Sequence, residues 1–82
     1  MRKEIICGRE MYKDVLTEEL ISLLKQNPKY ELECSSGGMT RWVRYDKLHS
    51  RMGITDNIYY DWYSIRDFRK YYKNNLWHFF VM

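Results

Sequence analysis

The sequence predicts an α+β fold: a two-layer sandwich in which helices cover one face of an antiparallel sheet. Three observations predict it. An amphipathic helical pattern runs through 17–28, alternation around a Gly-Gly turn runs through 30–45, and an apolar run ends the chain at 76–82. A chain of 82 residues is the size of one small domain, so 1–82 is treated as a single unit.

The first elements are a short strand at 3–7 and a helix at 17–28. Thr17 is a good N-cap residue, and Glu18 and Glu19 favour the first helical turn. Pro28 ends the helix, because the residue before a proline avoids helical angles. The predicted buried face of this helix consists of Tyr12, Leu16, Leu20, Leu23 and Leu24.

The segment 29–45 reads as a β-hairpin with Gly37 and Gly38 as a two-residue loop. This loop sets the register of the two strands. The inward pairs are Cys34 with Arg41, Leu32 with Val43, and Tyr30 with Tyr45; the outward pairs are Glu31 with Arg44, and Glu33 with Trp42. Because the apolar pairs belong in the core, Trp42 and Arg44 are expected on the outer face.

Two helix starts are predicted in the second half. Asp46 can cap a short helix that runs through Met52 and stops at Gly53. Ser64 and Asp67 form the S-x-x-D pattern of a capping box ahead of a further helical segment.

Between these starts, residues 56–63 permit two structures. Ile58, Tyr60 and Trp62 alternate as in a strand. A helical stripe is slightly favoured, because apolar residues recur at spacings of three and four; it comprises Ile58, Trp62, Ile65, Phe68 and Tyr72. With 76–82 as a final strand, the order is β-α-β-β-(α)-α-β, for which a ferredoxin-like split is the simplest arrangement.

Composition narrows the functional classes. Aromatic residues are 17% and hydrophobic residues 45% of the chain, which suffices for a core and is too apolar for a disordered chain. The net charge of +3 permits a nucleic-acid or an acidic protein partner without requiring either. No apolar run approaches the roughly 18 residues of a membrane span, and the N-terminus lacks a signal-peptide core, so a soluble, cytoplasmic protein is expected.

No pattern indicates catalysis, a metal or another cofactor. Cys7, Cys34, His49 and His78 show neither C-x-x-C nor H-x₃₋₅-H spacing, so reduced, structural cysteines are expected. The stretch "SSGG" is a hairpin turn and not a nucleophile elbow, and no phosphate-binding glycine pattern occurs. Spatial Cys34–His49 or Cys7–His78 pairs stay open, but a non-enzymatic protein is predicted.

The stretch 52–63, "MGITDNIYYDWY", carries a turn glycine with apolar residues at the spacings of a DNA reader. The residues at these motif positions are Leu48, Met52, Gly53, Ile54, Tyr59 and Trp62. In these residues the segment resembles a helix-turn-helix, which would make 46–63 a DNA-binding element. It departs from that pattern at His49, where a small residue is usual, and at Asp56 and Asp61, whose carboxylates would face phosphates.

A second stripe lies opposite the core stripe if 58–73 is helical. Its members are Tyr59, Tyr63, Arg66, Lys70 and Lys73. This face grades from aromatic to basic, and Tyr and Arg are enriched where protein interfaces anchor. It is therefore the predicted partner-binding surface, with Trp42 and Arg44 as a further candidate.

The chain lacks alanine, and residues with AT-rich codons outnumber those with GC-rich codons, which indicates an AT-rich genome such as that of a phage or mobile element. In size, composition and absence of a catalytic pattern, it resembles the small accessory proteins by which phages block host machinery, anti-CRISPR and other anti-defence inhibitors among them. The resemblance implies a non-catalytic inhibitor of a host protein or nucleoprotein complex. The alternative is a DNA-binding regulator that uses 46–63.

Overall fold

The computed structural model describes residues 1–80, which form an α+β fold with one seven-stranded antiparallel sheet and two helices. The strands lie in the order β1-β2-β7-β3-β4-β5-β6. Their bounds are β1 Arg2–Ile6, β2 Arg9–Leu16, β3 Glu31–Ser36, β4 Met39–Asp46, β5 Arg51–Thr55, β6 Asp61–Ser64 and β7 Leu76–Phe80; the helices are α1 Thr17–Gln26 and α2 Ile65–Tyr71.

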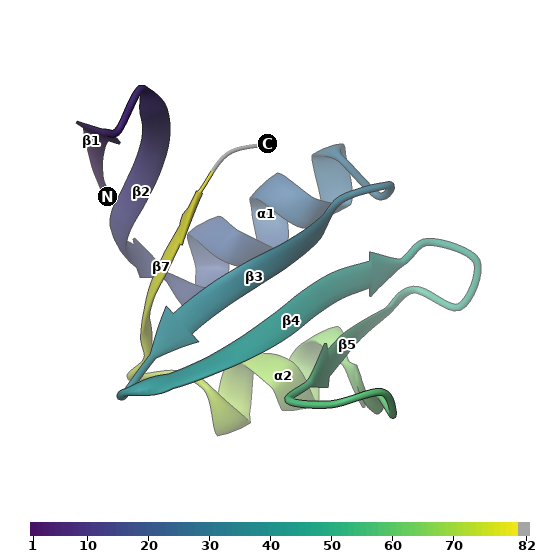
Figure 1. Ribbon diagram of the computed structural model, residues 1–82. Helices are drawn as coiled ribbons and strands as arrows, with labels where there is room; N and C mark the ends of the chain where they lie inside the picture. The colour runs from purple at the N-terminus through teal and green to yellow at the C-terminus, as the bar shows by residue number, and fades with distance from the viewer. Residues whose placement is uncertain (81–82) are drawn as a thin grey trace.

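Both helices lie against the same face of the sheet, and the opposite face is left open (Figure 1). Leu20, Ile21 and Leu24 of α1 and Phe68 of α2 are buried against side chains that the strands direct inward. Those strand residues are Val15, Leu32, Cys34, Val43, Tyr45, Met52, Ile54, Trp77 and Phe79. The sheet therefore has one face in the core and one face that no helix covers.

The predicted hairpin is confirmed, with its register. Leu32 pairs with Val43, and Glu33 with Trp42. Gly37 and Gly38 have φ angles of 59° and 79°, the left-handed region that a tight two-residue turn requires at both positions. Trp42 thus lies on the outer face, as predicted.

The N-terminal region contains a strand that the sequence did not reveal. The predicted strand at 3–7 corresponds closely to β1, but it continues through a turn into β2. The pairing of β2 with β7 shifts register between Tyr12 and Val15, and Asp14 has a φ of 54°. This bulge interrupts the alternation of β2 and hides its strand pattern. Leu16 ends β2 and is 53% exposed, so its predicted place on a buried helix face is wrong.

Thr17 does not cap α1 as predicted; it is the first helical residue and is buried. Its hydroxyl donates to the Tyr72 carbonyl oxygen and accepts a hydrogen bond of 2.9 Å from the Trp77 indole Nε1. The Glu19 carboxylate instead accepts from the Leu16 backbone N–H at 3.1 Å. Thr17 therefore ties the start of α1 to the end of α2 and to β7.

The short helix predicted to start at Asp46 is wrong, because the chain turns back as a hairpin. Asp46 Oδ2 lies 2.8 Å from His49 Nδ1 and 2.9 Å from Arg51 Nε, and Asp46 pairs with Arg51 across the β4–β5 ladder. Ser50 adopts a φ of 50° within the turn. The next residues alternate as a strand, with Met52 directed into the core.

The favoured long helix through 58–72 is also wrong. Side-chain hydrogen bonds hold a turn after β5: Thr55 Oγ1 accepts from the Asn57 N–H at 3.0 Å, and Asn57 Oδ1 accepts from the Tyr59 N–H at 2.9 Å. Such local bonds compete with helix formation. The chain then forms β6, and α2 begins where Ser64 Oγ accepts from the Asp67 N–H at 3.1 Å, as the predicted cap requires.

The helix-turn-helix prediction for 46–63 is therefore wrong. Asp46 ends β4, and the other structured parts of this segment, β5 and the start of β6, are strands that pair with each other. Gly53 lies opposite Trp62 in that ladder. Trp62, which the motif would place on the recognition helix, is thus held in a sheet. Helical and strand periodicities coincide over such short runs, which explains the false match.

The predicted C-terminal strand is confirmed as β7, and residues 81–82 of that prediction lie outside the described part of the chain. β7 does not close an edge of the sheet. It lies between β2 and β3, antiparallel to both. The seven-strand order is consequently not the ferredoxin-like arrangement expected from the sequence.

Candidate partner-binding surfaces

Cationic side chains gather at a hollow of about 440 Å³ beside the start of α1. We call it the basic hollow; it is lined by Leu16, Thr17, Glu18, Arg66, Arg69, Lys70 and Lys73. Arg69 forms an ion pair with Glu18, and the ion pairs among residues 1–80 include none for Arg66, Lys70 or Lys73. The hollow therefore presents unneutralised positive charge. Three of the residues predicted from the sequence meet here.

The two tyrosines of the predicted stripe lie elsewhere. Tyr59 is in the β5–β6 loop and is 79% exposed. Tyr63 is on β6, opposite Met52, and its ring packs near Phe68, Tyr71 and Tyr72. The predicted single stripe is thus divided between a loop, a half-buried strand position and the basic hollow.

Trp42 and Arg44 share the open face of the sheet with an aromatic stack whose residues, Tyr60 and Trp62, were not among the predicted binding residues. The Tyr60 and Trp62 rings are 5.4 Å apart and nearly parallel, and they lie over Gly53. The guanidinium of Arg44 lies 5.8 Å from the Tyr60 ring centroid, and that of Arg51 lies 4.1 Å from the Trp62 centroid. Only the lack of a side chain at Gly53 admits these rings. The strand-like alternation of Tyr60 and Trp62 was the available sequence signal.

The polar end of this stack is enclosed. The Tyr60 hydroxyl oxygen is buried and has no hydrogen-bond partner among residues 1–80. Burial, together with the nearby Glu31 carboxylate, raises the pKa of this hydroxyl. Tyr60 therefore stays protonated over the physiological pH range, and its ring serves as a packing surface.

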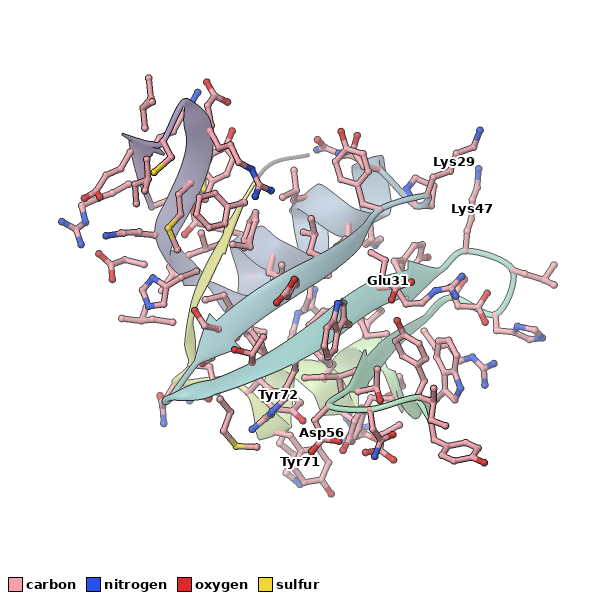
Figure 2. All side chains as sticks on the ribbon, viewed as in Figure 1. Lys29, Glu31, Lys47, Asp56, Tyr71 and Tyr72 are labelled. Atoms are coloured by element: carbon pink, nitrogen blue, oxygen red, sulfur yellow. The ribbon has the colours of Figure 1, made fainter. Side chains whose placement is uncertain are left out.

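A second hollow of about 440 Å³ lies on the same open face, where β2, β7, β3 and β4 adjoin. We call it the open-face hollow; it is lined by Arg9, Met11, Glu31, Leu32, Glu33, Ser35, Thr40, Trp42, His78, Phe79 and Phe80. Glu31 stands on β3 at the face away from the helices (Figure 2). Of the predicted residues, only Trp42 lines it. The sequence did not reveal this hollow, because its strands meet only through long-range pairing.

The cysteines and histidines that were considered as pairs lie in different surroundings. Cys34 is fully buried, and burial, with a smaller effect of Glu33, raises the pKa of its thiol to about 12. Its Sγ donates to the Leu32 carbonyl oxygen at 3.6 Å. His49 is held by Asp46 in an exposed turn, and His78 Nδ1 accepts from the Asp14 N–H at 3.2 Å. Cys7 is exposed in the β1–β2 turn, and both cysteines are free.

Over residues 1–80, no group of three or more histidine, cysteine or acidic side chains is placed to hold a metal ion. Within the same range, neither helix has the length and apolar character needed to cross a membrane.

Comparison with known proteins gives no match: no protein-family model fits the chain, and neither curated proteins nor solved structures include a significant relative.

Proposed function

We propose that this chain is a small, non-catalytic binding protein that docks an acidic surface of a protein partner into the basic hollow. The observation that carries the proposal is the meeting of Arg66, Arg69, Lys70 and Lys73 at one concave site. The hollow lies beside the start of α1, where Arg69 of α2 pairs with Glu18 of α1.

The electrostatics support an acidic occupant. Glu18 is the one carboxylate in the lining, and it is already paired with Arg69. A carboxylate entering the hollow would therefore meet Arg66, Lys70 and Lys73, which are all exposed. Complementary charge of this kind accelerates association and selects the partner.

Aromatic groups near α2 support a protein occupant. Tyr71 on α2 is 67% exposed (Figure 2). Its ring lies 5.5 Å from that of Tyr63. Neither ring lines the basic hollow, but tyrosine and arginine are both enriched among the residues that dominate binding energy in protein interfaces. Leu16, 53% exposed, adds an apolar surface to the hollow.

The biological setting is part of the proposal. An AT-rich coding bias and small size favour a phage- or mobile-element-encoded inhibitor of a host protein or nucleoprotein complex, with an anti-defence role as one form of it. An inhibitor of this kind needs no chemistry of its own, because occupying the partner's acidic surface suffices.

The test is charge reversal inside and outside the hollow. Arg66→Glu with Lys70→Glu is compared with Lys29→Glu plus Lys47→Glu, which changes the net charge equally on distant exposed loops (Figure 2). Binding of an acidic decapeptide and of a 20-base-pair DNA duplex is measured at low and at physiological salt. We expect the first double variant to lose at least about tenfold in peptide affinity and the second to lose little.

Capture from a host lysate, with and without nuclease, then identifies the physiological partner. A protein retained after nuclease treatment, and lost only with the Arg66/Lys70 variant, supports the proposal. Equal losses in both double variants would show non-specific charge attraction and contradict it. Binding to duplex DNA that greatly exceeds binding to the peptide would make nucleic acid the partner. Asp56→Ala with Asp61→Ala is expected to change neither the binding of the acidic peptide nor the capture of the protein partner, since these residues lie outside the hollow.

A further inference from the structure

The open face of the sheet carries four large aromatic rings, and arginine side chains lie over three of them. Arg9 lies 4.5 Å from the Phe80 ring centroid. Arg44 and Arg51 are similarly placed on Tyr60 and Trp62. Trp42 is the fourth ring, and the cation–ring contacts among residues 1–80 include none at Trp42.

The neighbour of Trp42 is a carboxylate without a cation. Glu33 is the direct cross-strand partner of Trp42, so their side chains adjoin on the same face. The ion pairs among residues 1–80 include neither Glu33 nor Glu31. Arg44, which stands opposite Glu31 in the ladder, is turned onto the Tyr60 ring instead.

Trp42 and Glu33 line the open-face hollow together with side chains that can form hydrogen bonds. Ser35, Thr40 and His78 line it. Because His78 Nδ1 accepts the Asp14 N–H, the neutral ring carries its proton on Nε2, as a donor. The ionic groups of the lining are Glu31, Glu33 and Arg9, so its formal charge is negative, opposite to that of the basic hollow.

We infer that the open-face hollow binds an arginine side chain of a partner, with the guanidinium stacked on Trp42 and hydrogen-bonded to Glu33. A planar guanidinium can stack on an indole while its N–H groups bind a carboxylate in two places, which an ammonium cannot do. Trp42 would then carry an arginine on its ring, as Phe80, Tyr60 and Trp62 already do on this face. It is independent of the basic hollow, on the other face of the sheet.

The test uses acetyl-Gly-Arg-Gly-amide as the probe, with the same peptide containing citrulline, an uncharged isostere, as its control. Titration is followed by ¹⁵N–¹H NMR at the backbone amides of 31–35 and 40–44 and at the Trp42 indole N–H. We expect saturable shifts with the arginine peptide. Glu33→Gln and Trp42→Leu should each weaken binding at least about fivefold. Trp62→Leu, on the same face but with its ring already covered by Arg51, should leave affinity unchanged.

Spectra of each variant establish that it is folded, and Glu33→Gln keeps the test decisive if Trp42→Leu does not fold. Equal binding of the citrulline peptide would overturn the inference. So would wild-type affinity in Glu33→Gln, shifts confined to α2, or no saturable shifts up to about 20 mM peptide. Concentration-dependent self-association that shields Trp42 would also overturn it, because a second copy would then be the occupant.

Discussion

At the scale of single residues, Gly53 shows how one missing side chain shapes the open face. A Cβ added there would lie 2.6 Å from Trp62 Cζ3 and 2.9 Å from Tyr60 Cδ1. Gly53→Ala must therefore displace the aromatic stack, and we expect it to lower the free energy of unfolding by about 1–3 kcal/mol in urea titrations. Trp62→Ala removes the nearest obstruction, so the loss caused by Gly53→Ala should be smaller in that background. An unchanged stability of Gly53→Ala would contradict this account of the stack.

The two cysteines differ sharply in their surroundings. Cys7 is exposed and Cys34 is fully buried with its thiol pKa raised to about 12, so we expect native alkylation at pH 8 to modify Cys7 alone. Intact mass after denaturation without reductant should show two modified thiols. Since the folded pKa of Cys34 exceeds its ordinary value of 9.0, this thiol stabilises the fold below pH 9 and loses that contribution as the pH rises toward 12. A disulfide, or two thiols modified in the native state, would refute this prediction.

At the scale of elements, the sequence predicted a structure correctly where the interactions that form it lie within a few residues. The Gly37–Gly38 turn predicted the β3–β4 register, and Ser64 predicted the start of α2, because each signal acts within a few residues. The predictions failed where a strand pattern is short or bulged. The bulge at Asp14 breaks the alternation of β2, so this strand was not predicted. The turn at Asn57 prevents a helix there, so residues whose spacing suggested a helix form β6 instead.

The candidate surfaces followed the same rule. Arg66, Lys70 and Lys73 were predicted together because they lie on or directly after α2. Their helical spacing holds for α2 itself, although the longer helix that was favoured does not form. Arg69 and Glu18 were not predicted, because their meeting depends on how α1 packs beside α2. The open-face hollow depends on pairing between β7 and β3, which are distant in sequence, and no local pattern predicts that pairing.

At the scale of the whole molecule, β7 joins two parts of the sheet that the chain builds separately. It pairs with β2 on one side and β3 on the other, so the β1–β2 hairpin reaches the remaining strands through it (Figure 1). Trp77 and Phe79 on this strand are almost completely buried, and Trp77 donates to Thr17. The last part of the chain is consequently central to the fold.

A chain ending at Leu76 is therefore expected not to fold. Loss of Trp77 and Phe79 removes contacts worth roughly 3–5 kcal/mol for each ring, against a total stability of about 5–15 kcal/mol for a domain. Thermal melting followed by circular dichroism should show no cooperative transition. Trp77→Phe keeps a large ring but loses the hydrogen bond to Thr17, so this variant should melt cooperatively at a lower temperature than the parent. A truncated chain that melts cooperatively near the full-length temperature would mean that β2 and β3 are held together without β7.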